Sequence, residues 1–192
     1  RLSFTSNYDT PFALSPDGTR IAYVATDSGA SEATLHLRSL DQFTATAMAG
    51  TEGASNPFFS PDGRWIGFVT ASSGTIRKVA VGGGPVSAVV ARVDWVYGAP
   101  SWTDNNEIVY HGSGRAGLLR VRDSGGEPAP LMDTSNVRVA GAPFALPGGK
   151  TVLVTDCSDR GAAEDDCATA VEAVRRKGEW TISTGAAAGT GR

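Results

Sequence analysis

The segment Phe12-Ala-Leu-Ser-Pro-Asp-Gly-Thr-Arg-Ile-Ala-Tyr-Val24 recurs along the chain as Phe58-Phe-Ser-Pro-Asp-Gly-Arg-Trp-Ile-Gly-Phe-Val69. Two degenerate copies follow, Ser101-Trp-Thr-Asp-Asn-Asn-Glu-Ile-Val-Tyr110 and Phe144-Ala-Leu-Pro-Gly-Gly-Lys-Thr-Val-Leu-Val154. Ser-Pro-Asp-Gly favours a tight turn, because proline presets φ, aspartate bonds the backbone beyond it and glycine accepts a positive φ. Aligned on Pro16, Pro61, Asp104 and Pro147, the copies lie 45, 43 and 43 residues apart. A fixed period of this length indicates a repeat architecture.

Each repeat has the pattern of four short strands. The turn joins a first apolar strand to an alternating second strand, as in Ile21 to Val24. A third strand of the Leu35 to Leu37 type recurs in the same phase, and a short fourth strand follows it. Four strands in about 43 residues predict the blade of a β-propeller, whose faces are buried by neighbouring blades. The alternative is a β-sandwich, which does not need the same turn at a fixed long period.

We therefore predict an all-β chain of about four four-stranded antiparallel blades, as an open arc or as part of a larger ring. The expected blades are residues 11–50, 51–92, 93–135 and 136–184, with residues 1–10 as the outer strand of a preceding blade and 185–192 as a flexible tail. Residues 162–176 are the one alternative helix, although their counterparts in earlier repeats are strands. The spare outer strand is the wrong count for self-closure, and open blade edges invite self-association.

The composition narrows the classes of function. Hydrophobic residues make up 41% of the 192 residues and charged residues 19%, which supports a folded core. The net charge of -3 shows no basic excess, so we expect no nucleic-acid partner. No run of 18 apolar residues occurs, so we expect no membrane insertion. The chain begins with Arg1 rather than Met, so we expect a processed product or part of a longer protein.

The repeat resembles those of TolB-like, WD40-like β-propellers, through Ser-Pro-Asp-Gly followed by Arg-Ile-Ala-Tyr or Arg-Trp-Ile-Gly-Phe. The sequence of the middle blades is similar to that of one branch of these proteins, as in the segments Leu37-Arg-Ser-Leu-Asp-Gln and Val79-Ala-Val-Gly-Gly-Gly-Pro. That branch is the propeller region of bacterial Ser/Thr protein kinases, which lies outside the membrane. The resemblance implies a periplasmic or extracellular bacterial module, but propellers host many unrelated activities.

No catalytic motif is present in the sequence. It contains no Gly-x-Ser-x-Gly nucleophile elbow, Walker loop or kinase signature set. The two histidines, His36 and His111, fall on strands and read as surface or interstrand residues rather than metal ligands. We therefore expect no catalytic residue, no metal and no cofactor in this chain.

Cys157 and Cys167 are the only cysteines, and they flank an acidic loop. Their even number and their expected positions at the ends of two neighbouring strands are compatible with a disulfide in an oxidising compartment. Two unrelated free thiols are the alternative. The acidic loop offers oxygen ligands for Ca²⁺, but its spacing fits no EF-hand and a solvated loop explains it as well.

The aromatic residues divide into two groups. Most recur at equivalent places and are expected to form the core between blades; these are Phe12, Phe58, Trp102 and Phe144 on the first strands and Tyr23, Phe68 and Tyr110 on the second. Trp95 and Tyr97 have no equivalents, and they lie in a connection between blades with Arg92 and Asp94. Arg138 lies in the corresponding connection of the next blade. These five residues are the candidate binding site at one mouth of the ring, although Trp95 and Tyr97 equally fit a cap on the core.

The sequence thus predicts a non-catalytic binding or scaffolding propeller that senses a protein or a small-molecule ligand. The alternative is an accessory propeller of an enzyme, a Ser/Thr protein kinase or a serine peptidase, whose catalytic domain is not in this chain.

Overall fold

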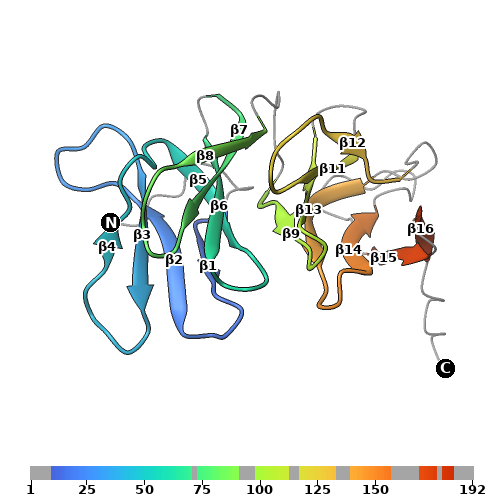
Figure 1. Cartoon of the computed structure of the whole chain (residues 1–192), viewed down its shortest axis with the longest axis horizontal. Helices are drawn as coiled ribbons and strands as arrows, with labels where there is room; N and C mark the ends of the chain where they lie inside the picture. Colours follow the sequence, from blue (N-terminus) through green and yellow to red (C-terminus); the bar gives the residue numbers. More distant parts are fainter. Residues whose placement is uncertain are drawn as a thin grey trace.

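The computed structural model describes residues 10–70, 73–90, 98–112, 117–132, 139–156, 169–176 and 179–183. Every element of secondary structure in these ranges is a β-strand, and the strands form four antiparallel sheets of four strands each (Figure 1). Blade 1 contains β1 (Phe12–Leu14), β2 (Arg20–Ala25), β3 (Thr34–Ser39) and β4 (Thr46–Ala47). Blade 2 contains β5 (Ala54–Phe59), β6 (Trp65–Thr70), β7 (Thr75–Ala80) and β8 (Ser87–Val90). Blade 3 contains β9 (Ser101–Trp102), β10 (Glu107–His111), β11 (Leu118–Arg122) and β12 (Ala129–Pro130). Blade 4 contains β13 (Val139–Ala145), β14 (Thr151–Asp156), β15 (Thr169–Arg176) and β16 (Glu179–Ser183).

The sheet topology is that of a β-propeller. In every sheet the strands are hydrogen-bonded in chain order, first to fourth. The first strands of consecutive blades contact one another, β1 with β5, β5 with β9 and β9 with β13, so they form the inner side of the arc. This arrangement confirms the propeller prediction and excludes a sandwich of two large sheets. The helix alternative for residues 162–176 is wrong for the part that is described, because Thr169–Arg176 is strand β15.

The repeated turn is built identically in blades 1 and 2. The Ser60 hydroxyl donates to Asp62 Oδ1 at 2.6 Å, and the Trp65 amide donates to the Ser60 hydroxyl at 2.9 Å. Gly63 has a φ of 66°, which glycine adopts without steric cost. In blade 3 the glycine position is taken by Asn106 with a φ of 58°, and asparagine is among the few residues that tolerate this region. The degenerate third repeat therefore keeps its turn.

Apolar residues between consecutive blades form the core. We call the face of a blade that is turned to the preceding blade its leading face, and the opposite one its trailing face. The junction of blades 1 and 2 buries Val24 and Leu35 against Ile66 and Phe68, and equivalent clusters fill the junctions of blades 2 and 3 and of blades 3 and 4. Each blade therefore depends on its neighbours to bury its two faces.

The prediction that all the recurring aromatics are core is wrong at the two ends of the arc. Phe58 and Trp102 are buried, whereas Phe12 is 50% and Phe144 62% exposed. The first-strand aromatics also do not share a face: Phe58 and Phe144 lie on trailing faces, Phe12 and Trp102 on leading faces. Since neighbouring positions in a strand point to opposite faces, a shift of one residue in the alignment places an aromatic ring on the other face.

The residue paired across the sheet with the first-strand phenylalanine differs between blades 2 and 4. Phe58 pairs with Gly67, and a Cβ placed on Gly67 would lie only 2.2 Å from the Phe58 ring. The ring thus covers a site that only glycine leaves open. Phe144 instead pairs with Leu153, which does carry a side chain, and the Phe144 ring is exposed.

Candidate functional site

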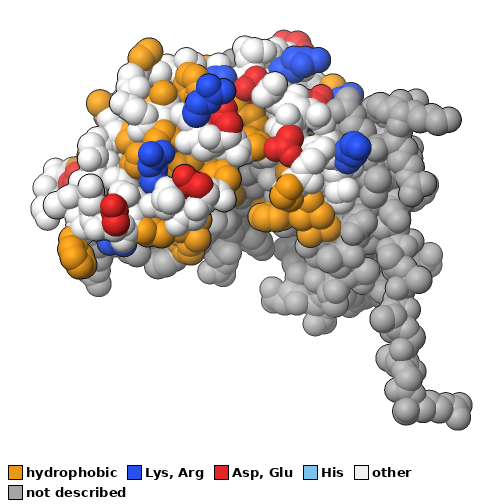
Figure 2. Space-filling view, turned by 60° about the horizontal axis from the view of Figure 1, so that its bottom comes forward, with side chains coloured by type: hydrophobic (Ala, Val, Ile, Leu, Met, Phe, Trp, Pro, Cys, Tyr) orange, Lys and Arg blue, Asp and Glu red, His pale blue; other side chains and the backbone are white. Residues whose placement is uncertain are grey.

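The blades present open grooves at the end that carries the turn between first and second strands, which we call the turn end. This end is at the bottom of Figure 1. A groove of about 360 Å³ separates the turn ends of blades 2 and 3. Its lining combines aromatic and charged side chains: Asp62, Arg64, Trp65, Trp102, Asp104 and Asp123. On the face shown in Figure 2, acidic and basic side chains are interspersed with hydrophobic ones over the described part of the chain.

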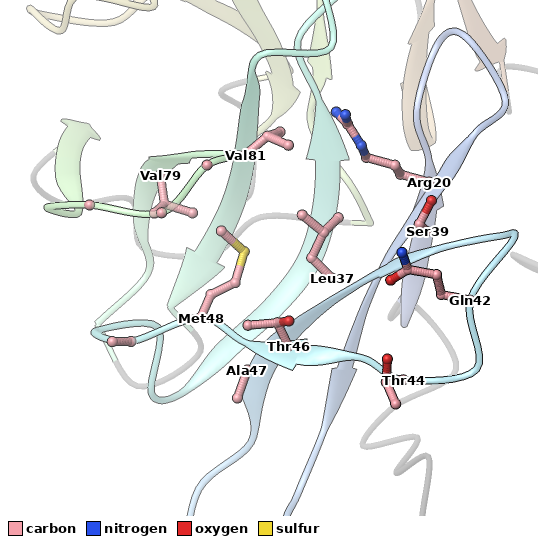
Figure 3. Close-up of a pocket in the computed structure, with 14 residues that line it drawn as sticks. Arg20, Leu37, Ser39, Gln42, Thr44, Thr46, Ala47, Met48, Val79 and Val81 are labelled. Atoms are coloured by element: carbon pink, nitrogen blue, oxygen red, sulfur yellow. The ribbon is translucent and has the colours of Figure 1, made fainter.

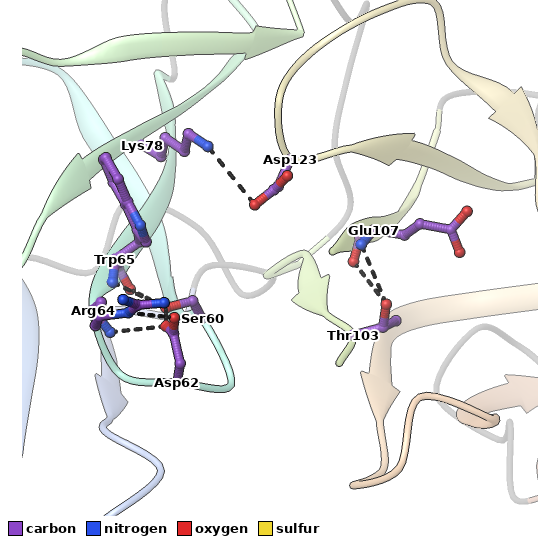
Figure 4. A network of polar contacts seen from close by, with 8 residues as sticks. All are labelled: Ser60, Asp62, Arg64, Trp65, Lys78, Thr103, Glu107 and Asp123. Carbon is purple, nitrogen blue, oxygen red and sulfur yellow. Dashed lines mark hydrogen bonds and ion pairs between the residues drawn. The ribbon is translucent and has the colours of Figure 1, made fainter. Parts of the chain in front are cut away.

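Lys78 joins the two walls of this groove (Figure 4). Its Nζ lies 4.9 Å from the ring centroid of Trp65 on its own blade and 5.6 Å from that of Trp102 on blade 3. It also forms an ion pair with Asp123 of blade 3, at 3.8 Å. The Lys78 side chain is only 15% exposed, and contact with aromatic faces and a carboxylate offsets the cost of removing its charge from water. Lys78 therefore bridges the two blades whose side chains line the groove.

The turn of blade 2 forms the rim of the groove. Asp62 accepts from the Ser60 hydroxyl, from the Arg64 amide at 3.0 Å and from Arg64 Nε at 2.7 Å. These hydrogen bonds, that from Ser60 most of all, lower the pKa of Asp62 to about 2. The Arg64 side chain is 80% exposed, so its guanidinium remains accessible at the rim.

The junction of blades 1 and 2 has a groove of different chemistry, about 410 Å³ in volume, lined by β3, β4 and their connection in blade 1 and by the end of β7 with the glycines after it (Figure 3). Arg20 follows its turn as Trp65 does, since each amide donates to the turn serine hydroxyl at 2.9 Å. Leu37 of blade 1 is at the position equivalent to Lys78 of blade 2, because Leu37 pairs with Ala22 as Lys78 pairs with Gly67. Val81 takes the place of Asp123 at the end of the third strand. The first groove thus combines aliphatic side chains such as Leu37 and Val81 with the polar Arg20, Gln42 and Thr44, and it lacks the aromatic and acidic set of the second.

The junction of blades 3 and 4 contains a buried ion pair. Arg120 donates to Glu107 Oε1 at 2.8 Å, with 30% and 10% of the two side chains exposed. His111 lies on the same face and is buried, which lowers its pKa. On the opposite face, burial raises the pKa of Tyr110 to about 12. The Tyr110 hydroxyl has no hydrogen-bond partner in the described part of the chain.

The sequence-predicted site residues fall largely outside the described ranges. The residues outside the described ranges include all five of the predicted mouth site, Arg92, Asp94, Trp95, Tyr97 and Arg138. They also include both cysteines, Cys157 and Cys167, and most of the acidic loop. The predicted mouth site and the disulfide therefore stay predictions.

The two histidines are described, and both are buried rather than on the surface. His36 stacks on Tyr23 with ring centroids 5.4 Å apart, lies 3.2 Å from the Thr34 hydroxyl and faces Asp27 at 3.6 Å. Among the described residues, no group of three His, Cys, Asp or Glu side chains is placed to hold a metal ion.

Sequence reasoning missed the groove between blades 2 and 3. Trp65 was aligned only as part of the second strand of its repeat, and Lys78 only as part of the third strand. The available signal was the exchange of Leu37 for Lys78 at equivalent positions of two successive third strands. A cation on an otherwise apolar face needs a partner on the next blade.

The fold is found among solved structures although sequence searches fail. No family model matches the chain, and the search of curated proteins finds no match. A protein of Agrobacterium tumefaciens assigned as TolB is similar in structure, with a TM-score of 0.70, 17% identity and 95% of this chain covered. TolB of Acinetobacter baumannii is similar with a TM-score of 0.70, 18% identity and 92% of this chain covered. The acylaminoacyl peptidase of Pyrococcus horikoshii gives a TM-score of 0.59 at 15% identity over 91% of this chain.

These likenesses define the class of fold. The chain is an all-β propeller of four-stranded antiparallel blades, and its fold is that of the TolB-like propellers. It spans 66% and 43% of the lengths of the two TolB chains and 32% of the peptidase. Such propellers occur both in TolB and as a domain of an enzyme, so the fold is shared by different functions. No helix among the described residues is long and apolar enough to cross a membrane.

Proposed function

We propose that the chain is a non-catalytic binding module that holds a segment of a protein partner at the turn end of its blades. The groove between blades 2 and 3 is the observation that carries the proposal. It places the half-buried indole of Trp65 beside three carboxylates and the exposed guanidinium of Arg64. An aromatic surface with charges of both signs at its rim is typical of protein recognition.

The shifted pKa values favour binding over proton-transfer chemistry. A general acid or base works best with a pKa near the working pH. Asp62 has a pKa of about 2 and Tyr110 of about 12, both far from neutrality. The lowered pKa of His111 favours its neutral form, and the ring is buried at a blade junction. Asp62 stabilises its turn, and Tyr110 and His111 are buried between blades, which supports a scaffold.

Selection of displayed random peptides against the chain tests this proposal. We expect the selected peptides to bind the Arg64→Glu variant about tenfold more weakly, equivalent to about 1.4 kcal/mol. Arg122→Glu is the matched control, since Arg122 is exposed on blade 3 and does not line the groove. Peptides that bind both variants equally, or a library that yields no binder, would contradict the proposal.

The finer part of the proposal is an extracytoplasmic sensor region of a bacterial Ser/Thr protein kinase. It is supported by the motifs of the middle blades, such as Leu37-Arg-Ser-Leu-Asp-Gln. The reading frame that encodes the chain is the direct test. A kinase domain and a membrane helix upstream of Arg1 are the expected result, and a secreted protein without either would contradict it.

An accessory role in a serine peptidase is the second candidate, favoured by the likeness to the acylaminoacyl peptidase. In that case the same reading frame encodes an α/β-hydrolase domain with a nucleophile elbow. A frame without such a domain would exclude this candidate.

A further inference from the structure

Two adjoining openings form one groove at the turn end between blades 1 and 2. The first is the opening of about 410 Å³ described above. The second, of about 400 Å³, extends it toward the turn of blade 2, where Gly63 and Arg64 join the lining. Both openings are lined by the same four residues, Arg20, Leu37, Val81 and Gly82. Because they share these walls, we treat them as one site and call it the Arg20 groove.

The floor of the Arg20 groove is apolar. Met48 and Val79 are buried there, and Leu37 and Val81 pack, partly buried, against the same core cluster. In Figure 3 the Leu37 side chain lies between those of Arg20 and Met48. A floor of this kind favours an apolar side chain of a ligand, because contact with it removes apolar surface from water.

The charged side chains that line the Arg20 groove are both basic. Arg20 and Arg64 are charged, and no Asp or Glu is among the lining residues that the structure describes. The Arg20 guanidinium forms no hydrogen bond or ion pair with a described residue. Its charge is the smallest of the causes that shift the pKa of Asp17. Arg64 pairs with Asp62 through Nε, and its side chain is 80% exposed. The groove therefore has an excess of positive charge.

A glycine keeps one wall of the groove low. Gly82 lines both openings, and a Cβ added there would meet no heavy atom within 4 Å. Its φ is not in the positive region that favours glycine. Neither packing nor backbone conformation therefore requires a glycine at this position. The missing side chain leaves the backbone open, which is typical of a place where another chain approaches closely.

We propose that the Arg20 groove binds an extended acidic segment of a partner protein, in which a carboxylate lies beside an apolar side chain. The carboxylate pairs with the Arg20 guanidinium, whose fork of donors matches its geometry. The apolar side chain packs on Leu37 and Val81, and the backbone of the segment passes Gly82. This site is independent of the groove between blades 2 and 3, because the carboxylates of that groove disfavour an acidic segment.

Selection of displayed random peptides with a counter-selection tests the proposal. Peptides are selected on the unsubstituted chain, and those that also bind the Arg20→Glu variant are removed. We expect the remaining peptides to be enriched in Asp or Glu next to an apolar residue. In fluorescence polarisation they should bind Arg20→Glu about tenfold more weakly, because a hydrogen-bonded charge pair is lost. Exchanging the acidic residue of the peptide for its amide should weaken binding to the unsubstituted chain, but not to Arg20→Glu.

Arg122→Glu is the matched control for charge, because Arg122 is exposed on blade 3 and lines neither opening. It should bind the peptides as the unsubstituted chain does, whereas Gly82→Leu, which places a side chain in the groove, should bind them more weakly. An empty pool after counter-selection, a pool without acidic residues, equal weakening in Arg122→Glu or unchanged binding to Gly82→Leu would each overturn the proposal. Circular dichroism of each variant verifies that it remains folded.

The counter-selection also separates this site from the groove between blades 2 and 3. Arg20 does not line that groove, so peptides that bind there keep their affinity for Arg20→Glu and are removed. Failure of one proposal is therefore distinguishable from failure of the other.

Discussion

Replacing Gly67 with alanine tests the packing of the junction between blades 2 and 3. The added Cβ would lie 2.2 Å from Phe58 Cζ, whereas carbon atoms in contact are about 3.5–4.0 Å apart. The ring must therefore move by more than about 1 Å. Overpacking of this kind costs about 1–3 kcal/mol. Moving the ring out of the junction forfeits its burial, about 1.5–3 kcal/mol.

Urea unfolding followed by tryptophan fluorescence measures the loss of unfolding free energy in Gly67→Ala. For a chain of this size the cost corresponds to a melting temperature about 2–12 °C lower. Gly82→Ala is the matched control, because Gly82 has no heavy atom within 4 Å of an added Cβ and no positive φ. We expect it to change stability by less than about 0.5 kcal/mol.

A double-mutant cycle isolates the contact. In the Phe58→Ala background the ring is absent, so Gly67→Ala should cost little, and the two substitutions should be strongly non-additive. If Gly67→Ala is as stable as Gly82→Ala, or if its penalty persists without the ring, the reasoning about this junction is wrong.

Three further predictions concern single polar groups. Hydrogen bonds lower the pKa of Asp62 from 3.8 to about 2, so the stability that the ionised carboxylate contributes to the fold is complete above pH 3.8 and is lost as the pH falls through 2. The difference in unfolding free energy between the unsubstituted chain and Asp62→Asn should therefore narrow over that range in acid titrations. A constant difference would contradict this. Asn106 has a φ of 58°, so Asn106→Ala should destabilise the chain by about 1 kcal/mol in urea unfolding, while Asn106→Gly should not. The Tyr110 hydroxyl is buried and has no hydrogen-bond partner among the described residues, so Tyr110→Phe should be at least as stable as the unsubstituted chain, with a gain of up to about 1–3 kcal/mol; a less stable variant would contradict this.

The repeated turn allowed the fold to be predicted from the sequence. Ser60, Asp62 and Gly63 each have a local physical role in the turn, so the motif identifies the same corner in every blade. The strands then follow from alternation and length. The number of strands in each blade follows from the length of the repeat, and the number of blades follows from its four copies.

The burial of the end blades and the groove could not be predicted in this way. Phe12 and Phe144 match buried residues of the middle blades, but burial depends on a neighbouring blade, and none of the described blades covers these two positions. Lys78 contacts Trp102 and Asp123 across a junction. Such a contact depends on two repeats at once, and a motif read within one repeat does not contain it.

Hydrogen bonds across the blade junctions join residues about one repeat apart. The Thr10 amide donates to Asn56 Oδ1 at 2.7 Å, and the Ala145 amide donates to the Ser101 hydroxyl at 2.9 Å. The main contacts between blades join consecutive ones only. Among the described strands, each blade is therefore held by the blade before it and the blade after it. A duplicated blade inserted at a junction would meet the same kind of interface on both of its faces. Gene duplication is therefore a simple way to lengthen the arc.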